Sequence, residues 1–274
     1  MLLARPEGSA ASTDNPVDRV ESTQLSVSIE LCNEHSALLR ICRSTDRLRR
    51  LAFVALLVLS ALAMGAGEPG GEPGSQFSSP GEYEARLLND RGVILLATGR
   101  IDQAIDLFTQ AIARNPRLAF AYYNRGNAYQ LRKQPKEAID DYSEAIGINP
   151  DFALAFMNRG VAHSTQNNLE DALRDLNKAV ELAPRNLDGY YNRAMVFTQL
   201  GRLLEATEDY SVAIQLNERD VELYIARGRV WESLDEIDKA IADYTNALAI
   251  DPANDKAHRR LKQLGAQGRS DSGR

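Results

Sequence analysis

One block of sequence repeats five times between residues 85 and 254, with a period of about 34 residues. A small residue stands at the eighth position of each block, and an alanine stands in register in its second half. The two series are Gly92, Gly126, Gly160, Ala194 and Gly228, then Ala104, Ala138, Ala172, Ala206 and Ala240. A fixed period of about 20 to 50 residues is typical of stacked repeats, in which each unit contacts its neighbours. The period therefore constrains the architecture first, and it favours an extended binding surface over a single catalytic pocket.

Each block predicts a helix, a turn and a second helix. In the second half, a bulky residue follows the alanine by four positions, and a small residue follows three positions later. These residues are Phe108, Tyr142, Leu176, Tyr210 and Tyr244, then Ala111, Ala145, Ala179, Ala213 and Ala247. Offsets of four and three place them on one helical face. Gly99, Asn167 and Gly201 separate the two halves, where a left-handed backbone is tolerated, and a proline closes four of the copies.

This order of small, large and small positions resembles the tetratricopeptide repeat. The resemblance implies an all-α fold, a right-handed superhelical solenoid of five helix-turn-helix repeats. The repeats span residues 85–118, 119–152, 153–186, 187–220 and 221–254, followed by a capping helix at 255–265 and a disordered tail at 266–274. Copy four departs mildly, with Glu218 in place of the proline and Ala194 in place of the glycine.

The N-terminal third has three unlike segments. Residues 1–50 are polar and basic and are predicted to be disordered, residues 51–66 are apolar, and residues 67–84 form a Gly/Pro/Ser linker. A basic stretch followed by an apolar run and small residues is the layout of a secretory signal. Three interpretations stay open: a cleaved signal, an uncleaved membrane anchor that is short for a span of about 20 residues, and a buried or accidental apolar stretch. The first two predict a periplasmic, secreted or membrane-anchored protein with its repeats outside the cytoplasm.

The resemblance further implies that certain positions of each first helix face a concave groove. At the sixth position, Asn124, Asn158 and Asn192 would form a ladder similar to that in O-linked GlcNAc transferases. A carboxamide can bond the peptide units of an extended partner, although asparagine is also simply common at this position. The other predicted groove residues are Phe120, Tyr123, Asn127, Leu154, Met157 and Tyr191. They suit a peptide with apolar side chains, unless some of them only pack on neighbouring helices.

In four copies, an arginine at the seventh position is matched by an aspartate at the twenty-third. The pairs are Arg125 with Asp141, Arg159 with Asp175, Arg193 with Asp209, and Arg227 with Asp243. In the first copy, Leu107 stands where the aspartate would pair with Arg91. We expect structural ion pairs between the two helices of a unit, because repeated pairs carry no unique catalytic geometry.

Composition and motifs exclude several function classes. The net charge of −6 and the isoelectric point near 5.3 argue against a nucleic-acid partner. His35, His163 and His258 are isolated, and the chain has no HExxH, GxSxG or phosphate-loop motif, so we expect no catalytic residue, metal or cofactor. The sequence predicts a non-enzymatic adaptor for a protein or peptide, with a self-assembling homo-oligomer or a regulatory subunit of an envelope enzyme complex as alternatives.

Overall fold

The computed structural model describes residues 79–271, with side chains described as far as residue 265. The predictions for residues 1–50 and 51–66, and most of the predicted linker, lie outside the described residues. Within residues 79–271 the secondary structure consists of α-helices without a strand. The helices are α3 (Pro80–Ala97), α4 (Ile101–Arg114), α5 (Ala119–Leu131), α6 (Pro135–Ile148), α7 (Ala153–Thr165), α8 (Leu169–Leu182), α9 (Leu187–Gln199), α10 (Leu203–Leu216), α11 (Val221–Ser233), α12 (Ile237–Ile250) and α13 (Asp255–Asp271).

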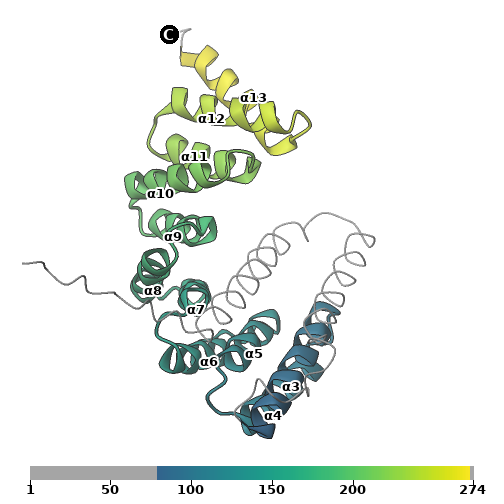
Figure 1. Cartoon of the computed structure of the whole chain (residues 1–274). Coiled ribbons are helices and arrows are strands. Elements are labelled where there is room, and N and C mark those ends of the chain that lie inside the picture. The colour runs from purple at the N-terminus through teal and green to yellow at the C-terminus, as the bar shows by residue number, and fades with distance from the viewer. Residues whose placement is uncertain (1–78, 272–274) are drawn as a thin grey trace, which may run out of the picture. The chain divides into compact units, whose positions relative to one another are not determined.

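The helices form five pairs that follow one another in chain order (Figure 1). Within a pair, the first helix packs on the second, and each second helix packs on the first helix of the next unit. The first helices α3, α5, α7 and α9 also contact one another directly. The predicted all-α repeat fold is confirmed.

The eighth position is the point of closest approach between the helices of a unit. A Cβ atom added at Gly126 would lie 2.7 Å from Cε1 of Tyr142. At Gly160 it would lie 2.9 Å from Cγ of Leu176 and 3.0 Å from the backbone oxygen of Ala172. The bulky residue of the second helix therefore occupies the space that a side chain on the first helix would need.

The turns inside the units have a left-handed residue at the same register position. Their φ angles are 79° at Gly99, 60° at Lys133, 62° at Asn167, 73° at Gly201 and 61° at Asp235. Three of these turns were expected from their residue types. Lys133 adopts the same conformation because the geometry of the helix pair requires it, although lysine gives little signal for it, and Asp235 is of a residue type that is enriched in this conformation.

Two helix boundaries correct the predicted ones. Helix α3 begins at Pro80, inside the predicted linker 67–84, because Ser79 caps it by accepting the Glu82 N–H at 3.3 Å and proline suits the first turn. Helix α13 continues to Asp271, beyond the predicted end at residue 265 and into the predicted disordered tail. Residues 266–271 contain no proline that would stop the helix.

Candidate partner-binding face

The candidate site is the row of inner positions on the first helices of the three central units. We call this row the central face. It comprises Phe120, Tyr123, Asn124, Asn127, Gln130 and Leu131 on α5, Leu154, Met157, Asn158, Val161, Ser164 and Thr165 on α7, and Asp188, Tyr191, Asn192, Met195, Thr198 and Gln199 on α9. The nine residues predicted from the sequence all belong to it.

The asparagines of the central face form hydrogen bonds between successive units. Asn158 donates through Nδ2 to Oδ1 of Asn127 at 2.8 Å and to the hydroxyl of Tyr123 at 3.2 Å. Asn124 donates through Nδ2 to Oδ1 of Asn89 at 2.9 Å. The predicted ladder is therefore partly internal, because these N–H groups stabilise contacts between first helices.

Asn192 differs from the other two asparagines. It is half-buried and forms no hydrogen bond within the described part of the chain. Asn124 and Asn158 are also half-buried, and their Oδ1 atoms accept no hydrogen bond there. The row thus keeps acceptor oxygens for an external donor, and Asn192 keeps its N–H groups as well.

Three of the predicted apolar contacts belong to the core. The exposed fractions are 6% for Tyr123, 8% for Leu154 and 4% for Met157. The ring of Tyr123 packs 4.9 Å from that of Phe152 and 5.9 Å from that of Tyr142, measured between centroids. These side chains fill space between helices, which corrects the prediction that they form an open apolar surface.

The exposed apolar side chains of the central face are Phe120 (37%), Met195 (40%) and Leu131. Phe120 was predicted, whereas Met195 and Leu131 were missed. Both stand at inner positions of their helices, the ninth and the thirteenth. Applying the register to every inner position would have found them.

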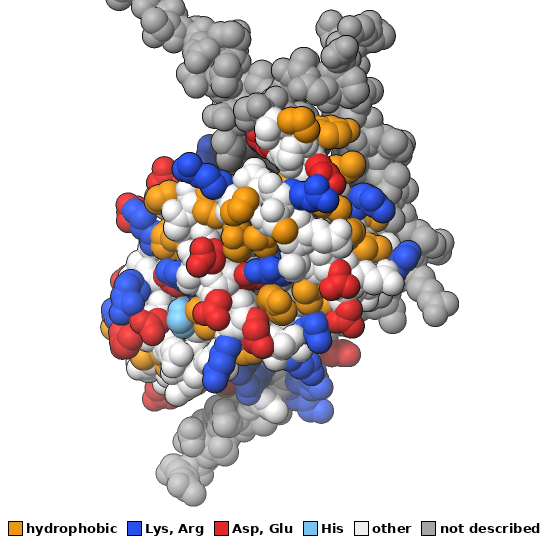
Figure 2. All heavy atoms as spheres, turned by 90° about the horizontal axis from the view of Figure 1, so that it is seen from below, with side chains coloured by type: hydrophobic (Ala, Val, Ile, Leu, Met, Phe, Trp, Pro, Cys, Tyr) orange, Lys and Arg blue, Asp and Glu red, His pale blue; other side chains and the backbone are white. Residues whose placement is uncertain are grey.

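The central face carries one ionisable group at its inner positions apart from tyrosine, namely Asp188. Its backbone N–H donates to Oδ1 of Asn186 at 2.9 Å, at the start of α9. Figure 2 shows a face of the molecule on which acidic and basic side chains are interspersed among apolar ones. The inner positions of α5, α7 and α9 by themselves carry little charge.

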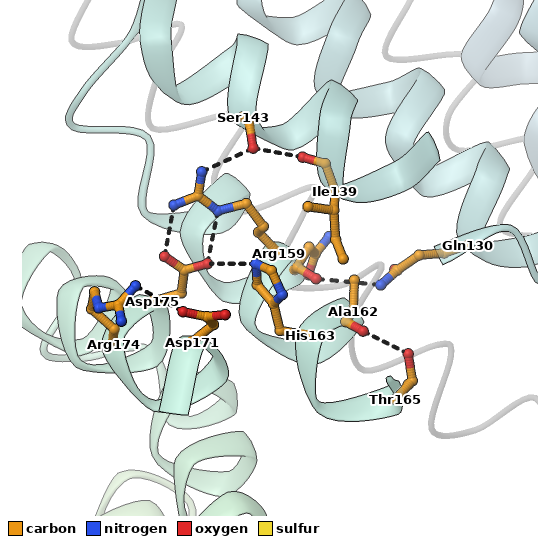
Figure 3. Close-up of polar contacts among 11 residues, drawn as sticks. Gln130, Ile139, Ser143, Arg159, Ala162, His163, Thr165, Asp171, Arg174 and Asp175 are labelled. Carbon is orange, nitrogen blue, oxygen red and sulfur yellow. Dashed lines mark hydrogen bonds and ion pairs between the residues drawn. The ribbon is translucent and has the colours of Figure 1, made fainter. Parts of the chain in front are cut away.

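The arginine at the seventh position joins three helices. Arg159 donates through Nε and Nη2 to both carboxylate oxygens of Asp175, each at 2.7 Å, and through Nη1 to Oγ of Ser143 at 3.0 Å (Figure 3). Ser143 lies on the second helix of the preceding unit. The same arrangement recurs for Arg125 with Asp141 and Thr109, for Arg193 with Asp209 and Asn177, and for Arg227 with Asp243 and Ser211.

These ion pairs have a structural role, as the spacing indicated. The aspartates are buried and the guanidinium groups are partly exposed. Burial raises the pKa of Asp141 above its ordinary value, and the guanidinium of Arg125 opposes that rise. The hydrogen bond from each arginine to the preceding unit was not predicted from the sequence. Its acceptors nevertheless stand at the same position of successive repeats: Thr109, Ser143, Asn177 and Ser211.

His163 lies beside one of these pairs and not in a cluster of catalytic groups. Its Nε2 is 4.0 Å from Oδ2 of Asp175. Across residues 79–271, no three His, Cys, Asp or Glu side chains are grouped so that they could hold a metal ion. None of the helices in that range has the length and apolar character needed to cross a bilayer.

Comparisons with known proteins agree with the repeat fold. Models described as tetratricopeptide repeat match residues 119–152, 151–226 and 221–254, and a model described as TPR repeat matches residues 92–132. The chain belongs to the tetratricopeptide repeat family. Repeats of this family bind peptides and proteins, so this tetratricopeptide repeat protein is a protein-interaction adaptor by fold and family.

One curated relative is the TPR repeat-containing thioredoxin TDX of Oryza sativa subsp. japonica, which is 36% identical over 65 residues. The match covers 24% of this chain and 20% of the rice protein, so it concerns a fifth of that relative. It therefore supports the repeats alone.

Solved structures share the fold at low sequence identity. The crystal structure of MamA is 21% identical, with a TM-score of 0.57, over 62% of this chain and 92% of that one. YrrB, described as a TPR protein with an unusual peptide-binding site, is 21% identical, with a TM-score of 0.56, over 65% and 92%. The pilF protein of Pseudomonas aeruginosa is 18% identical, with a TM-score of 0.60, over 69% and 90%.

Proposed function

We propose that this protein is a non-enzymatic adaptor that holds a peptide or protein partner on the central face. The observation that carries the proposal is the composition of that face. Six inner positions on each of α5, α7 and α9 present amides, hydroxyls and apolar groups, with Asp188 as the only Asp, Glu, Lys, Arg or His. A row of low charge suits a partner with apolar side chains and free peptide groups, because neither has to desolvate a facing charge.

The exposed and the half-buried groups of the central face have different roles in recognition. Phe120, Leu131 and Met195 supply apolar area that a partner can cover. The half-buried Asn158 and Asn192 supply hydrogen-bonding groups that fix the orientation of a peptide. The crystal structure of YrrB, which is described as having a peptide-binding site, shares the same fold.

A pair of charge substitutions tests this function. We expect Phe120→Lys combined with Met195→Lys to abolish capture of partners, because a partner would have to desolvate two ammonium groups. The measurement is affinity capture from cells of the source organism followed by mass spectrometry. Met195 is exposed, and Phe120 is exposed on one side while its ring packs 5.0 Å from that of Phe152, so helicity should be kept with only a small fall in the melting temperature.

The matched control is Leu204→Lys. Leu204 is more exposed than either of the two target residues, and it lies on the second helix α10, outside the central face. The control should capture the same proteins as the native chain. If the double variant still retains those proteins, the central face is not the binding site.

We also propose that residues 51–66 direct export, so that the repeats act in a bacterial envelope. The support is the basic, apolar and small-residue layout of the sequence, and these residues lie outside the described part of the chain. Fusing residues 1–84 to alkaline phosphatase in an export-competent bacterium should give active phosphatase. Deleting residues 51–66 should remove that activity, and an inactive native fusion would count against export.

A further inference from the structure

One face of α3 lacks the helix that covers the same face of the later first helices. Leu223, at the third position of α11, packs on Ala213 and Ile214 of the preceding helix α10. Ala128, at the tenth position of α5, packs on α4 in the same way. The residues at these two positions are buried in all later first helices: Ala121, Ala155, Gly189, Leu223 and Ala257, then Ala128, Ala162, Val196, Val230 and Leu264.

In α3 the third and tenth positions hold Leu87 and Ile94. Leu87 is 46% exposed and Ile94 is half-buried. The two residues are seven positions apart, which is about two helical turns, so they lie on one face of the helix. Leu223 and Val230 are of similar size, and they are buried on α11, which packs on α10. We call this side of α3 the outward face, and its residues have the apolar character of a surface that a second helix covers elsewhere in the stack.

Arg91 stands between these two residues, and both of its usual partners are missing. In later units the arginine binds an aspartate of its own second helix and a polar side chain of the preceding one, as Arg227 does with Asp243 and Ser211. In the first unit Leu107 replaces the aspartate, and no second helix precedes α3 within residues 79–271. Arg91 is exposed and forms no hydrogen bond or ion pair in that range. Its guanidinium can therefore bind an acceptor on an incoming chain.

The acidic groups of α3 have other partners. Glu82 forms a salt bridge of 3.1 Å with Arg86, and Glu84 forms one of 2.8 Å with Arg114. Asp90 accepts a hydrogen bond from the side-chain amide of the residue before it, at 3.2 Å. Among the described residues, the guanidinium on the outward face is thus left with a positive charge that no carboxylate of α3 balances. A complementary group on a partner is acidic.

We propose that the outward face of α3 docks an amphipathic α-helix of a partner protein, whose apolar stripe covers Leu87 and Ile94 and whose acidic side chain binds Arg91. A helix fits because a second helix takes the equivalent place on α5, α7, α9 and α11. A carboxylate fits because its two oxygens can accept parallel N–H groups of a guanidinium. The outward face lies outside the central face, so this inference goes beyond the proposed function.

A second copy of this chain suits the outward face poorly. Two α3 helices related by a two-fold axis would bring like charges together, because Arg91 lies in the middle of the face. At its other end the described stack finishes with α13, whose exposed side chains include Arg259 and Lys262. These cations would also repel Arg91. Charge complementarity therefore favours a different protein.

Two synthetic helices test the inference on the full chain. Both copy residues 203–216, because α10 covers Leu223, the equivalent of Leu87. One carries Ser211→Asp and the other Ser211→Lys, since Ser211 accepts from the next arginine at 2.9 Å. A side-chain staple on the polar face keeps each peptide helical, because so short a helix is marginal alone. Fluorescence anisotropy should show about 3- to 10-fold tighter binding of the Ser211→Asp peptide.

Variants of the chain locate the contact. Arg91→Glu should reverse the preference, so that the Ser211→Lys peptide binds more tightly. Its control, Arg185→Glu, changes another exposed arginine outside α3 and should keep the native preference. Leu87→Ala should weaken both peptides by about 3- to 10-fold, because it removes apolar area from the contact. Leu204→Ala, at an exposed leucine on α10, should weaken neither.

Failure of the Ser211→Asp peptide to bind, or equal binding of both peptides to the native chain, overturns the inference. An unchanged preference in the Arg91→Glu variant overturns it as well. If light scattering shows a dimer of the native chain that Leu87→Ala dissociates, a second copy occupies the outward face and the inference is wrong. None of these results bears on the central face, because α3 carries none of its residues.

Discussion

At the residue scale, the two helices of a unit can approach closely because the eighth position of the first helix carries a small residue. The bulky residue of each second helix lies under the eighth position of the first, and Phe108, Tyr142, Leu176 and Tyr244 are fully buried there. The fourth unit accepts a methyl group, since Ala194 takes this position and is itself fully buried. The position thus requires a small residue, and the local backbone decides whether a methyl group fits.

Two glycine substitutions separate packing from helix propensity. Gly160→Ala should lower the free energy of unfolding by about 1–2 kcal/mol, because the overpacking cost of about 1–3 kcal/mol exceeds the helix gain of up to about 1 kcal/mol. The new Cβ would lie 3.0 Å from the backbone oxygen of Ala172, and a helix backbone cannot relieve the contact by changing rotamer as a side chain could. Gly147→Ala, with open space around it on α6, should raise that free energy by about 0.5–1 kcal/mol. Urea unfolding compares the two variants, and equal shifts would contradict the packing argument.

Buried tyrosines make the fold sensitive to alkaline pH. Burial raises the pKa of Tyr142, Tyr210 and Tyr244 above the ordinary value of 10.0. Because the folded pKa exceeds the unfolded one, the stability linked to these groups is complete below about pH 10 and is lost as the pH rises toward the folded pKa. We expect tyrosinate absorbance from these residues to appear together with loss of helicity. If all the tyrosines ionise near pH 10 while the protein stays helical, the expected link between their ionisation and unfolding is contradicted.

At the element scale, the arginines couple each unit to the one before it. A single guanidinium bridges a first helix, its own second helix and the preceding second helix, as Arg159 does with Asp175 and Ser143. In a linear repeat array, such nearest-neighbour contacts decide whether the units unfold together. Within residues 79–271 the first unit lacks its version of the pair, because Leu107 replaces the aspartate opposite Arg91.

Because of this coupling, we expect the same Arg→Lys substitution to change stability by different amounts at Arg159 and at Arg91, which stand at the same position of their repeats. Arg159→Lys keeps the charge but loses the planar fork, so it should destabilise the protein by about 1–3 kcal/mol. Arg91→Lys, at an exposed site without the aspartate, should stay within about 0.5 kcal/mol. Thermal unfolding followed by circular dichroism measures both variants. Similar losses for both would mean that the bridge contributes little.

At the scale of the described stack, the two ends differ. At the C-terminal end, α13 covers the apolar cluster of Ile225 and Tyr244 with Ala257 and Leu264. It is also held by a salt bridge of 2.7 Å from Lys256 to Glu222. At the other end, Leu87 on α3 is exposed, although the residues at the same third position of later helices are buried: Ala121, Ala155, Gly189, Leu223 and Ala257.

Truncation tests the capping role of α13. A chain that ends at Asn254 should lose several kcal/mol of stability and should aggregate, because Ile225 and Tyr244 become accessible to water. A chain that ends at Gly265 keeps the packed part of the helix and should behave like the full chain. Thermal unfolding and light scattering distinguish the two. Equal stability of both truncations would show that the cap is dispensable.

Much of the scaffold was predictable because its requirements recur in every unit. Gly126 and Tyr142 are spaced by the geometry of a helix pair, and copies of the same spacing reinforce one another. The helix ends were less predictable, since Ser79 and the end of α13 lie outside the repeated part. The inner face was predictable as a set of positions, but the exposure of each side chain was not.

By itself, the sequence determined the all-α repeat fold, the turns at Gly99, Asn167 and Gly201 and the arginine-aspartate pairs, because these depend on short spacings along one chain and on their repetition. Only the tertiary structure decided which groups remain for a partner. Tyr123, Leu154 and Met157 are buried, and the N–H groups of Asn158 are used by Tyr123 and Asn127. The reason is that burial and hydrogen bonding at this face depend on side chains of the neighbouring unit, which are distant in the sequence and come close only when the helices stack.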